Sequence, residues 1–260
     1  MLRLRALVWI LVAVAAWGQE TPEELYRLGM RLLAEHKPDE AVAPLRRVVE
    51  LRPKSAAAWA GLGRAQAGRG EYALAEEPFH QACLLDPAMT DACLYYGRTL
   101  YLQNRFQEAL TVLASAAKRF PDSVDTLRMQ ALCLEALDRA DEAEKAFTAA
   151  VRLQGSSAAD EDPAIDYGVF LYRRGRPEES LRALQGALQR RPNSARANLE
   201  AGCVLLSLDR ADEAARYLER SAALNPGSQR THLLLGKAYV RLGKTDLAQR
   251  ELDQGSRTVK

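Results

Sequence analysis

The heptapeptide LDRADEA occupies residues 137–143 and returns unchanged at residues 208–214. The flanks of the two copies agree as well. A small residue precedes each copy by six positions, and a large apolar residue follows each copy by four. Identity that extends into the flanks indicates a longer periodic unit, and a period of this kind determines the fold of a whole chain.

Three series of residues define the period. Small residues stand at intervals of 34, 34, 34, 37, 34 and 34 at Gly29, Gly63, Gly97, Ala131, Gly168, Gly202 and Gly236. Two further series keep the same intervals, namely Pro53, Pro87, Pro121, Gly155, Pro192 and Pro226, and Ala41, Ala75, Ala109, Ala143, Ser180, Ala214 and Ala248. Three series with one period and one three-residue insertion predict seven copies of a 34-residue unit from Pro22 to Lys260.

Each unit contains two amphipathic segments. In the second unit Trp59 and Leu62 share one helical face, and Ala75 and Phe79 share a face of a second helix. The fifteenth position of the unit holds Gly, Asn or Asp in six units, the residues that best adopt the left-handed conformation after a helix, and only His36 departs. The pattern predicts a helix, a tight turn and a second helix in every unit.

LDRADEA is this turn together with the start of the second helix. Its first Asp is expected to end one helix, and its later acidic residues favour the N-terminus of the next. The small residues at the eighth and twentieth positions of each unit leave room for the two helices to cross closely. Pro44 and Pro78, at equivalent positions, are expected to kink or loosen the second helices of the first two units.

The motifs Trp59-x-x-Leu62-Gly63, Ala75-x-x-x-Phe79 and Pro87 resemble the tetratricopeptide repeat, a 34-residue helix-turn-helix unit. The resemblance covers most of the chain. It implies an all-α protein, an α-solenoid of about seven units that form a right-handed superhelix, whose first helices line a concave face that binds peptide segments. Gln66, Ala131, Gly155 and Ser180 depart from the family's pattern.

The period also sets the domain boundaries. Repeats 1–4 are expected over residues 22–157, an inserted loop over residues 158–160, and repeats 5–7 over residues 161–260. The stretch GSSAADEDP, residues 155–163, lacks the closing proline and carries the insertion. Because each repeat contacts only its neighbours, we expect the two blocks to melt separately and proteases to cut first near residues 158–161.

Residues 1–18, MLRLRALVWILVAVAAWG, differ from the repeats in composition. Two arginines precede an apolar run of 13 residues that ends in small residues, which is typical of a secretory signal peptide. A spanning helix needs about 20 apolar residues, so an uncleaved membrane anchor is the alternative. We therefore expect an exported protein, periplasmic or secreted, that contacts the membrane only if this segment is uncleaved.

Charge and motifs exclude several classes of function. Residues 19–260 carry 34 basic and 34 acidic side chains, and a neutral chain is an improbable nucleic-acid partner. The three histidines lie in different repeats, and the four cysteines lack metal-ligand spacing. The stretch GLGRAQAG at residues 61–68 is similar to a nucleotide-binding loop, but its glycines fall on packing positions and no strand precedes it. We expect no catalysis, no cofactor, no metal and no small-molecule substrate.

The groove is then the expected functional surface. Packing uses positions 4, 7, 8 and 11 of each first helix, so positions 2, 5, 9, 12 and 13 are expected to face the groove. These positions are rich in Arg and Tyr, which are enriched in binding hot spots. The guanidinium of Arg can also bind a carboxylate through two hydrogen bonds. The candidate partner-binding residues are Tyr26, Arg64, Leu94, Arg98, Tyr101, Arg128, Tyr172, Arg173, Lys237 and Arg241.

The alternative is that these are ordinary solvated helix residues. The Lys and Asn carboxylate clamp of the chaperone-binding family members is not matched. Two functions follow: a scaffold that binds a partner segment, partly acidic, in its groove outside the cytoplasm, or a structural accessory subunit of an envelope or secretion assembly that uses its ends and convex face.

Cys83 and Cys93 flank the turn between the second and third repeats almost symmetrically. Antiparallel helices place such residues opposite one another, and an oxidising compartment lets a disulfide form. The alternative is that both are buried small apolar residues, as free cysteines often are. Both alternatives stay open at this point.

Overall fold

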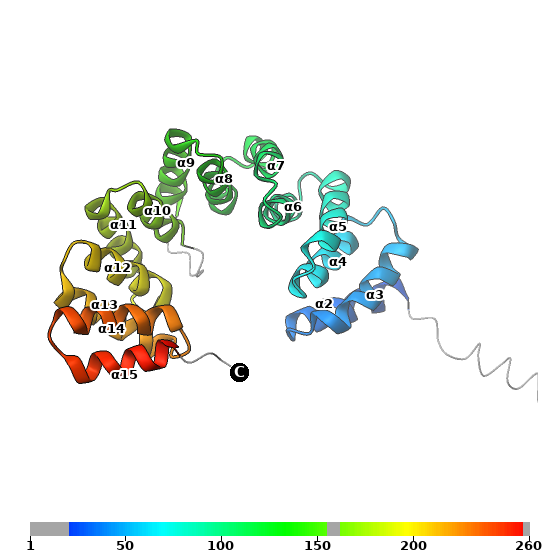
Figure 1. Cartoon of the computed structure of the whole chain (residues 1–260). Helices are drawn as coiled ribbons and strands as arrows, with labels where there is room; N and C mark the ends of the chain where they lie inside the picture. Colours follow the sequence, from blue (N-terminus) through cyan, green and yellow to red (C-terminus); the bar gives the residue numbers. More distant parts are fainter. Residues whose placement is uncertain (1–20, 155–161, 257–260) are drawn as a thin grey trace, which may run out of the picture. The chain divides into compact units, whose positions relative to one another are not determined.

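A computed structural model describes residues 21–154 and 162–256. Over these two ranges the protein consists of fourteen α-helices without a strand (Figure 1). The predicted signal peptide, residues 1–18, and the predicted inserted loop, residues 158–160, lie outside the described residues.

The helices alternate as the first and second members of seven hairpins, as the repeat predicts. The first helices are α2 (Pro22–Ala34), α4 (Ala56–Gly68), α6 (Thr90–Leu102), α8 (Val124–Ala136), α10 (Pro163–Arg173), α12 (Ala195–Ser207) and α14 (Gln229–Arg241). The second helices are α3 (Pro38–Leu51), α5 (Tyr72–Leu85), α7 (Phe106–Arg119), α9 (Ala140–Leu153), α11 (Pro177–Arg190), α13 (Ala211–Leu224) and α15 (Thr245–Ser256).

The chain divides into two compact units, residues 1–112 and 113–260, with the boundary inside α7. In the first unit α2 packs on α3 and α4, and α5 packs on both α4 and α6. In the second unit every helix from α8 to α15 contacts the next one, and the first helices α8, α10, α12 and α14 contact each other in succession. The division predicted at residues 158–160 stays a prediction.

The turn inside each hairpin has one conformation in all seven repeats. The fifteenth residue is left-handed, with φ of 57° at His36, 56° at Asp138 and 58° at Asp209. His36 therefore departs in residue type only, because the turn imposes the same conformation on it. In LDRADEA the Arg after the left-handed Asp donates two hydrogen bonds of 2.7–2.8 Å to the Glu three residues later, in both copies.

Side-chain oxygens cap several of the described helix starts. Thr21 and Glu24 form a capping box, in which the Thr21 amide donates to Glu24 Oε2 at 2.8 Å. The hydroxyls of Ser55, Ser123, Ser194 and Ser228 accept backbone amide hydrogen bonds at the starts of α4, α8, α12 and α14. Neither Pro44 nor Pro78 ends its helix, since α3 and α5 each run for 14 residues.

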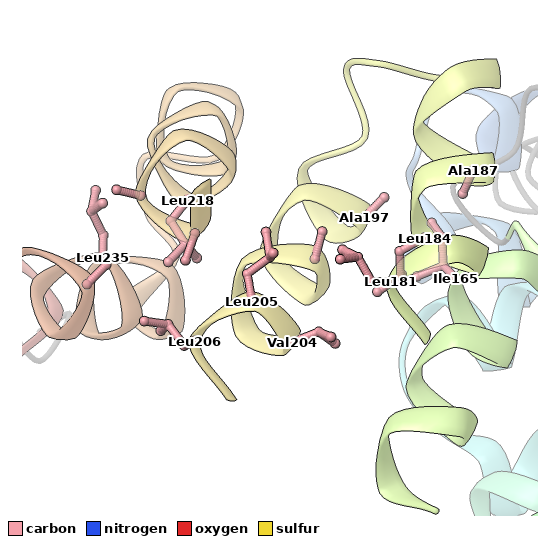
Figure 2. Close-up of a cluster of buried hydrophobic side chains, with 14 of the residues drawn as sticks. Ile165, Leu181, Leu184, Ala187, Ala197, Val204, Leu205, Leu206, Leu218 and Leu235 are labelled. Atoms are coloured by element: carbon pink, nitrogen blue, oxygen red, sulfur yellow. The ribbon is translucent and has the colours of Figure 1, made fainter. Parts of the chain in front are cut away.

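The small eighth residue of each repeat lies where the two helices of a hairpin cross. A Cβ atom added to Gly202 would lie 2.5 Å from Leu218 Cγ, and one added to Gly63 would lie 2.7 Å from Phe79 Cδ1. Both distances are shorter than any side-chain contact, so only glycine fits. The large residues interlock around these crossings, and Figure 2 shows Leu184, Leu205 and Leu218 in the continuous core of the second unit.

The fourth and fifth repeats are joined by aromatic stacking. The ring centroid of Phe147 in α9 lies 5.9 Å from that of Tyr167 and 5.4 Å from that of Phe170, both in α10. Beside the rings, Glu144 accepts hydrogen bonds from Arg176 Nη1 at 2.8 and 2.9 Å. The helices on either side of residues 155–161 are therefore closely packed.

A buried histidine links α14 to α15, the last two helices of the second unit. His232 of α14 is 6% exposed, with Nδ1 2.7 Å from Glu251 Oε2 in α15 and Nε2 2.8 Å from the Pro226 carbonyl oxygen. Burial lowers the pKa of His232, but the hydrogen bonds with Glu251 and Pro226 outweigh it, so the pKa is raised above its usual value of 6.5. The charged ring donates through both nitrogens.

We expect this contact to make the stability of the second unit depend on pH. Because the folded-state pKa lies above the unfolded value of about 6.5, the stabilisation is fully present below that value and is lost as pH rises through the folded pKa. We therefore expect the free energy of unfolding to fall as pH rises from about 6 to about 8. Urea unfolding of the wild type and His232→Gln at both pH values measures it, and equal pH slopes would contradict the prediction.

Candidate partner-binding surfaces

Positions 2, 5, 9, 12 and 13 of the first helices are called here the first-helix face. Of the ten predicted partner-binding residues, nine reach the surface. Arg64, Arg98, Arg173, Lys237 and Arg241 are exposed, and Tyr26, Leu94, Tyr101 and Tyr172 are half-buried. Tyr26, Arg64, Leu94, Arg98 and Tyr101 belong to the first compact unit, and Tyr172, Arg173, Lys237 and Arg241 belong to the second.

One of the ten predicted partner-binding residues, Arg128, does not reach the surface. It was predicted as a groove residue that contacts a partner, but it is 6% exposed, and its Nη1 donates to Asp166 Oδ2 at 2.7 Å. Asp166 is 5% exposed, and its other oxygen accepts a hydrogen bond from Arg196. The guanidinium of Arg128 faces a carboxylate of the next repeat, so it stabilises the stack of helices instead of facing a partner.

A ladder of ion pairs runs along the second unit and was not predicted from the sequence. An acid at the sixth position of one repeat pairs with an arginine at the second position of the next, as Asp166 does with Arg196. Glu200 repeats the arrangement and accepts two hydrogen bonds from Arg230, at 2.7 and 3.0 Å. The two pairs share a spacing of 30 residues, which was the signal available in the sequence.

The other basic candidates of the second unit also have internal partners, with one exception. Arg173 Nη1 lies 3.0 Å from Glu135 Oε1, and Arg241 Nη1 lies 3.4 Å from Asp209 Oδ1. Lys237 is exposed and forms no ion pair with any residue in the two described ranges, and the same holds for Arg64 in the first unit. The basic surface available to a partner is therefore smaller than the sequence predicts.

A pocket of about 250 Å³ lies in the first unit between α4, α5 and α6. Its walls include both ninth-position arginines of the second and third repeats, and an aromatic pair in which the Phe79 and Tyr95 rings are stacked with centroids 5.4 Å apart. Tyr72 and Leu102 complete the apolar part of the lining. Arg64 and Arg98 were predicted, whereas Tyr72 and Tyr95 were not, because they lie outside the positions assigned to the groove.

A disulfide joins α5 and α6, two of the three helices around this pocket. Cys83 of α5 and Cys93 of α6 are bonded, with their Cα atoms 4.9 Å apart. Cys93 is 3% exposed and lies two residues before Tyr95. The bond therefore joins the second and third repeats.

Reduction should weaken the first unit. A disulfide that closes a loop of 10 residues stabilises a fold by roughly 2–3 kcal/mol through the unfolded state. We expect Cys83→Ser with Cys93→Ser to lower the free energy of unfolding of residues 21–112 by that amount under oxidising conditions, and not under reducing ones. Non-reducing peptide mapping that recovers both cysteines as free thiols under oxidising conditions would contradict the prediction.

The two described ranges hold one fully buried free cysteine. Cys133 is buried, and burial raises the pKa of its thiol to about 12, so it is not a nucleophile at neutral pH. In the same ranges no three His, Cys, Asp or Glu side chains gather closely enough to hold a metal ion. The helices described there are also too short or too polar to cross a bilayer.

Two models of the tetratricopeptide repeat match the sequence. One matches residues 26–92, 97–158 and 171–229, and the other matches residues 205–259. Together they cover most of the chain.

Individual proteins give a more limited likeness. The type IV pilus assembly protein PilF of Pseudomonas aeruginosa is 31% identical over 102 residues, which are 39% of this chain and 40% of that protein. This chain thus matches less than half of the relative's length. The solved structure of Pseudomonas aeruginosa PilF is 24% identical, covers 81% of this chain and 94% of its own, and has a TM-score of 0.64.

Two further structures share the fold. Cut9–Hcn1 of the APC/C hetero-tetramer has a TM-score of 0.71 at 19% identity, over 90% of this chain and 45% of that one. A tetratricopeptide repeat protein from Parabacteroides merdae has a TM-score of 0.69 at 15% identity, over 92% and 93% of the two chains. Proteins with this repeat are typically non-catalytic scaffolds for protein interactions. With the repeat models matched along most of its length, this chain belongs to the tetratricopeptide repeat family.

Proposed function

We propose that this protein binds a segment of a partner protein on its first-helix face, outside the cytoplasm, and that the pocket between α4 and α6 carries a main contact. The observation that supports the proposal is the meeting of two exposed arginines with a stacked aromatic pair in one pocket. Binding hot spots are enriched in Arg and Tyr.

The chemistry of the pocket favours a partner segment with an acidic residue. Arg64 is exposed and has no carboxylate partner in the described residues, so its charge is available. A guanidinium binds a carboxylate through two parallel hydrogen bonds, while Tyr72 and Leu102 offer apolar surface to a neighbouring side chain. An acidic residue beside an apolar one would match both features.

The alternative function is that of an accessory subunit that contacts partners by its ends and convex face. The terminal helices of the array give little support to contacts at its ends. The third and tenth positions of the first helices are buried in repeats 2–7, but Glu24 and Arg31 occupy them in the first repeat and are exposed. In α15 the exposed Gln249 donates to Asp253 at 2.7 Å, at a position held by Val42 or Ala215 in other repeats. The outer faces of α2 and α15 are polar, which disfavours stacking there.

Export remains part of the proposal. It is supported by the charged and apolar pattern of residues 1–18, and by the likeness to a type IV pilus assembly protein, which points to assembly or secretion at the cell envelope. Intact-mass analysis of the exported fraction should find a chain that begins near residue 19. A membrane-bound protein that retains Met1 would favour the uncleaved anchor.

The binding site is tested with a partner recovered by crosslinking in the native cell envelope. Arg64→Ala with Arg98→Ala should weaken binding by about thirtyfold, or ~2 kcal/mol, and leave the fold intact. The matched control is Arg46→Ala with Lys54→Ala, which removes two exposed charges from the same unit away from the pocket. Equal losses in both variants would show a general charge effect, and full affinity in the pocket variant would move the contact to the convex face.

A further inference from the structure

The first helices of the last three repeats carry apolar side chains on their exposed side. The residues are Val169 and Tyr172 of α10, Leu199 and Cys203 of α12, and Leu233 and Val240 of α14, called here the apolar strip. Leu233 is 37% exposed and Val240 is 60% exposed, and the other four are half-buried. Because α10 contacts α12 and α12 contacts α14, the strip crosses three adjacent helices of one compact unit.

The charged side chains along both edges of the strip form ion pairs with other residues of the chain. Near the N-terminal ends of the helices lies the ladder in which Asp166 pairs with Arg196 and Glu200 pairs with Arg230. Near the C-terminal ends, Arg173 pairs with Glu135, and Arg241 pairs with Asp209. A highly charged partner would have to compete with these pairs, so the edges do not favour one.

Lys237 is the exception within the strip. It lies on α14 between Leu233 and Val240 in sequence, is exposed, and forms no ion pair with any described residue. An apolar surface that contains one uncompensated ammonium group complements a segment that is apolar apart from one carboxylate.

We propose that the apolar strip binds a partner segment that presents aliphatic or aromatic side chains to α10, α12 and α14 and one carboxylate to Lys237. The proposal rests on the proposed function, since it assumes that a partner reaches the first-helix face, but it assigns a second contact in the other compact unit. Packed helices lie about 8–10 Å apart, so three of them span about 20 Å. An extended segment of about six residues covers that length.

The side-chain pattern of the partner follows from this geometry. In an extended segment every second side chain points to the same side, so apolar residues at alternate positions would face the strip. The carboxylate is expected at one end of the segment, because Lys237 belongs to the last of the three helices.

Synthetic peptides test the proposal with the full-length mature protein. The probes are fluorescein-labelled octapeptides in which Leu alternates with Ser and an Asp stands at one end or the other. Matched peptides replace Asp by Asn, or every Leu by Ser. We expect at least one Asp peptide to bind in fluorescence anisotropy, the Asn peptide to bind several-fold more weakly, and the peptide without Leu not to bind at about 1 mM.

The variants locate the site. Val240→Glu should weaken binding at least about tenfold, and Leu233→Glu should act in the same direction. Leu247→Glu is the matched control, because Leu247 is 41% exposed but lies on α15 outside the strip. Lys237→Gln should weaken binding of the Asp peptide and leave binding of the Asn peptide unchanged. Circular dichroism on each variant establishes that it is folded.

Three outcomes overturn the proposal. They are no binding of any Leu peptide at about 1 mM, equal losses in Val240→Glu and Leu247→Glu, or equal effects of Lys237→Gln on both peptides. The proposed function is judged separately with the crosslinked native partner. If that partner is lost by the Arg64 and Arg98 variant but keeps full affinity for Val240→Glu, the strip is excluded and the proposed function stands.

Discussion

Replacing Asp166 by alanine should lower the free energy of unfolding of residues 113–260 by about 3–5 kcal/mol. The carboxylate is 5% exposed and neutralises Arg128, which is 6% exposed. Without it the guanidinium of Arg128 stays buried and loses its 2.7 Å contact with Asp166, and removing one member of a buried pair costs far more than the pair itself contributes. Urea unfolding followed by far-UV circular dichroism measures the loss.

Two variants separate this explanation from simple loss of an ion pair. Arg196→Ala removes the half-exposed partner of the same carboxylate, so its cost should be within about 1 kcal/mol. Replacing both Asp166 and Arg128 by leucine removes the buried charges together, and should restore most of the stability lost in Asp166→Ala. If Asp166→Ala costs no more than Arg196→Ala, the buried pair does not form in solution.

The fold could be predicted from sequence because its determinants are local and repeated. The left-handed turn at Asp138, the cap at Ser194 and the close crossing at Gly202 each depend on residues within one repeat. A period of 34 residues presents the same signal seven times, so a departure in one copy, such as His36, does not hide it. The cysteines of the disulfide also flank one turn, so their pairing was one of two alternatives that the sequence left open.

The candidate site was predicted less well because pairing depends on neighbouring repeats. Helical position correctly placed Arg64 and Lys237 on the surface, but it does not reveal which charge lies opposite on the next helix. The prediction that Arg128 faces a partner was wrong for that reason. Asp166 and Glu200 hold the sixth position of their repeats, and only the packing of adjacent first helices shows which arginines they neutralise.

The apolar strip was visible in the sequence but was not recognised. Reading the arginines and tyrosines of all seven repeats together predicted one basic and aromatic groove. Taken by compact unit, positions 5, 9 and 12 of the first helices of repeats 5–7 are apolar apart from Lys237, while repeats 2 and 3 contribute Arg64 and Arg98 to the first-helix face. The two units therefore present different chemistry to a partner.

Replacing Phe147 by alanine is expected to cost about 3–5 kcal/mol and to separate the unfolding of the fourth repeat from that of the fifth. Phe147 is fully buried and touches both Tyr167 and Phe170 of α10, so its ring belongs to the core of one repeat and to the interface with the next. In a repeat array the stability is roughly the sum of repeat and interface contributions. Removing this ring lowers both.

Phe120→Ala is the matched control, because Phe120 follows α7 and is only half-buried, and its loss should cost less. Phe147→Leu keeps much of the volume and should cost less than Phe147→Ala. Hydrogen exchange in Phe147→Ala should become faster in α8 and α9 than in α12 and α13, since the latter keep all their neighbours. If exchange accelerates equally in all four helices, or the variant unfolds in one transition at a cost below about 1 kcal/mol, the α9–α10 interface does not couple the repeats as the packing of Phe147 indicates.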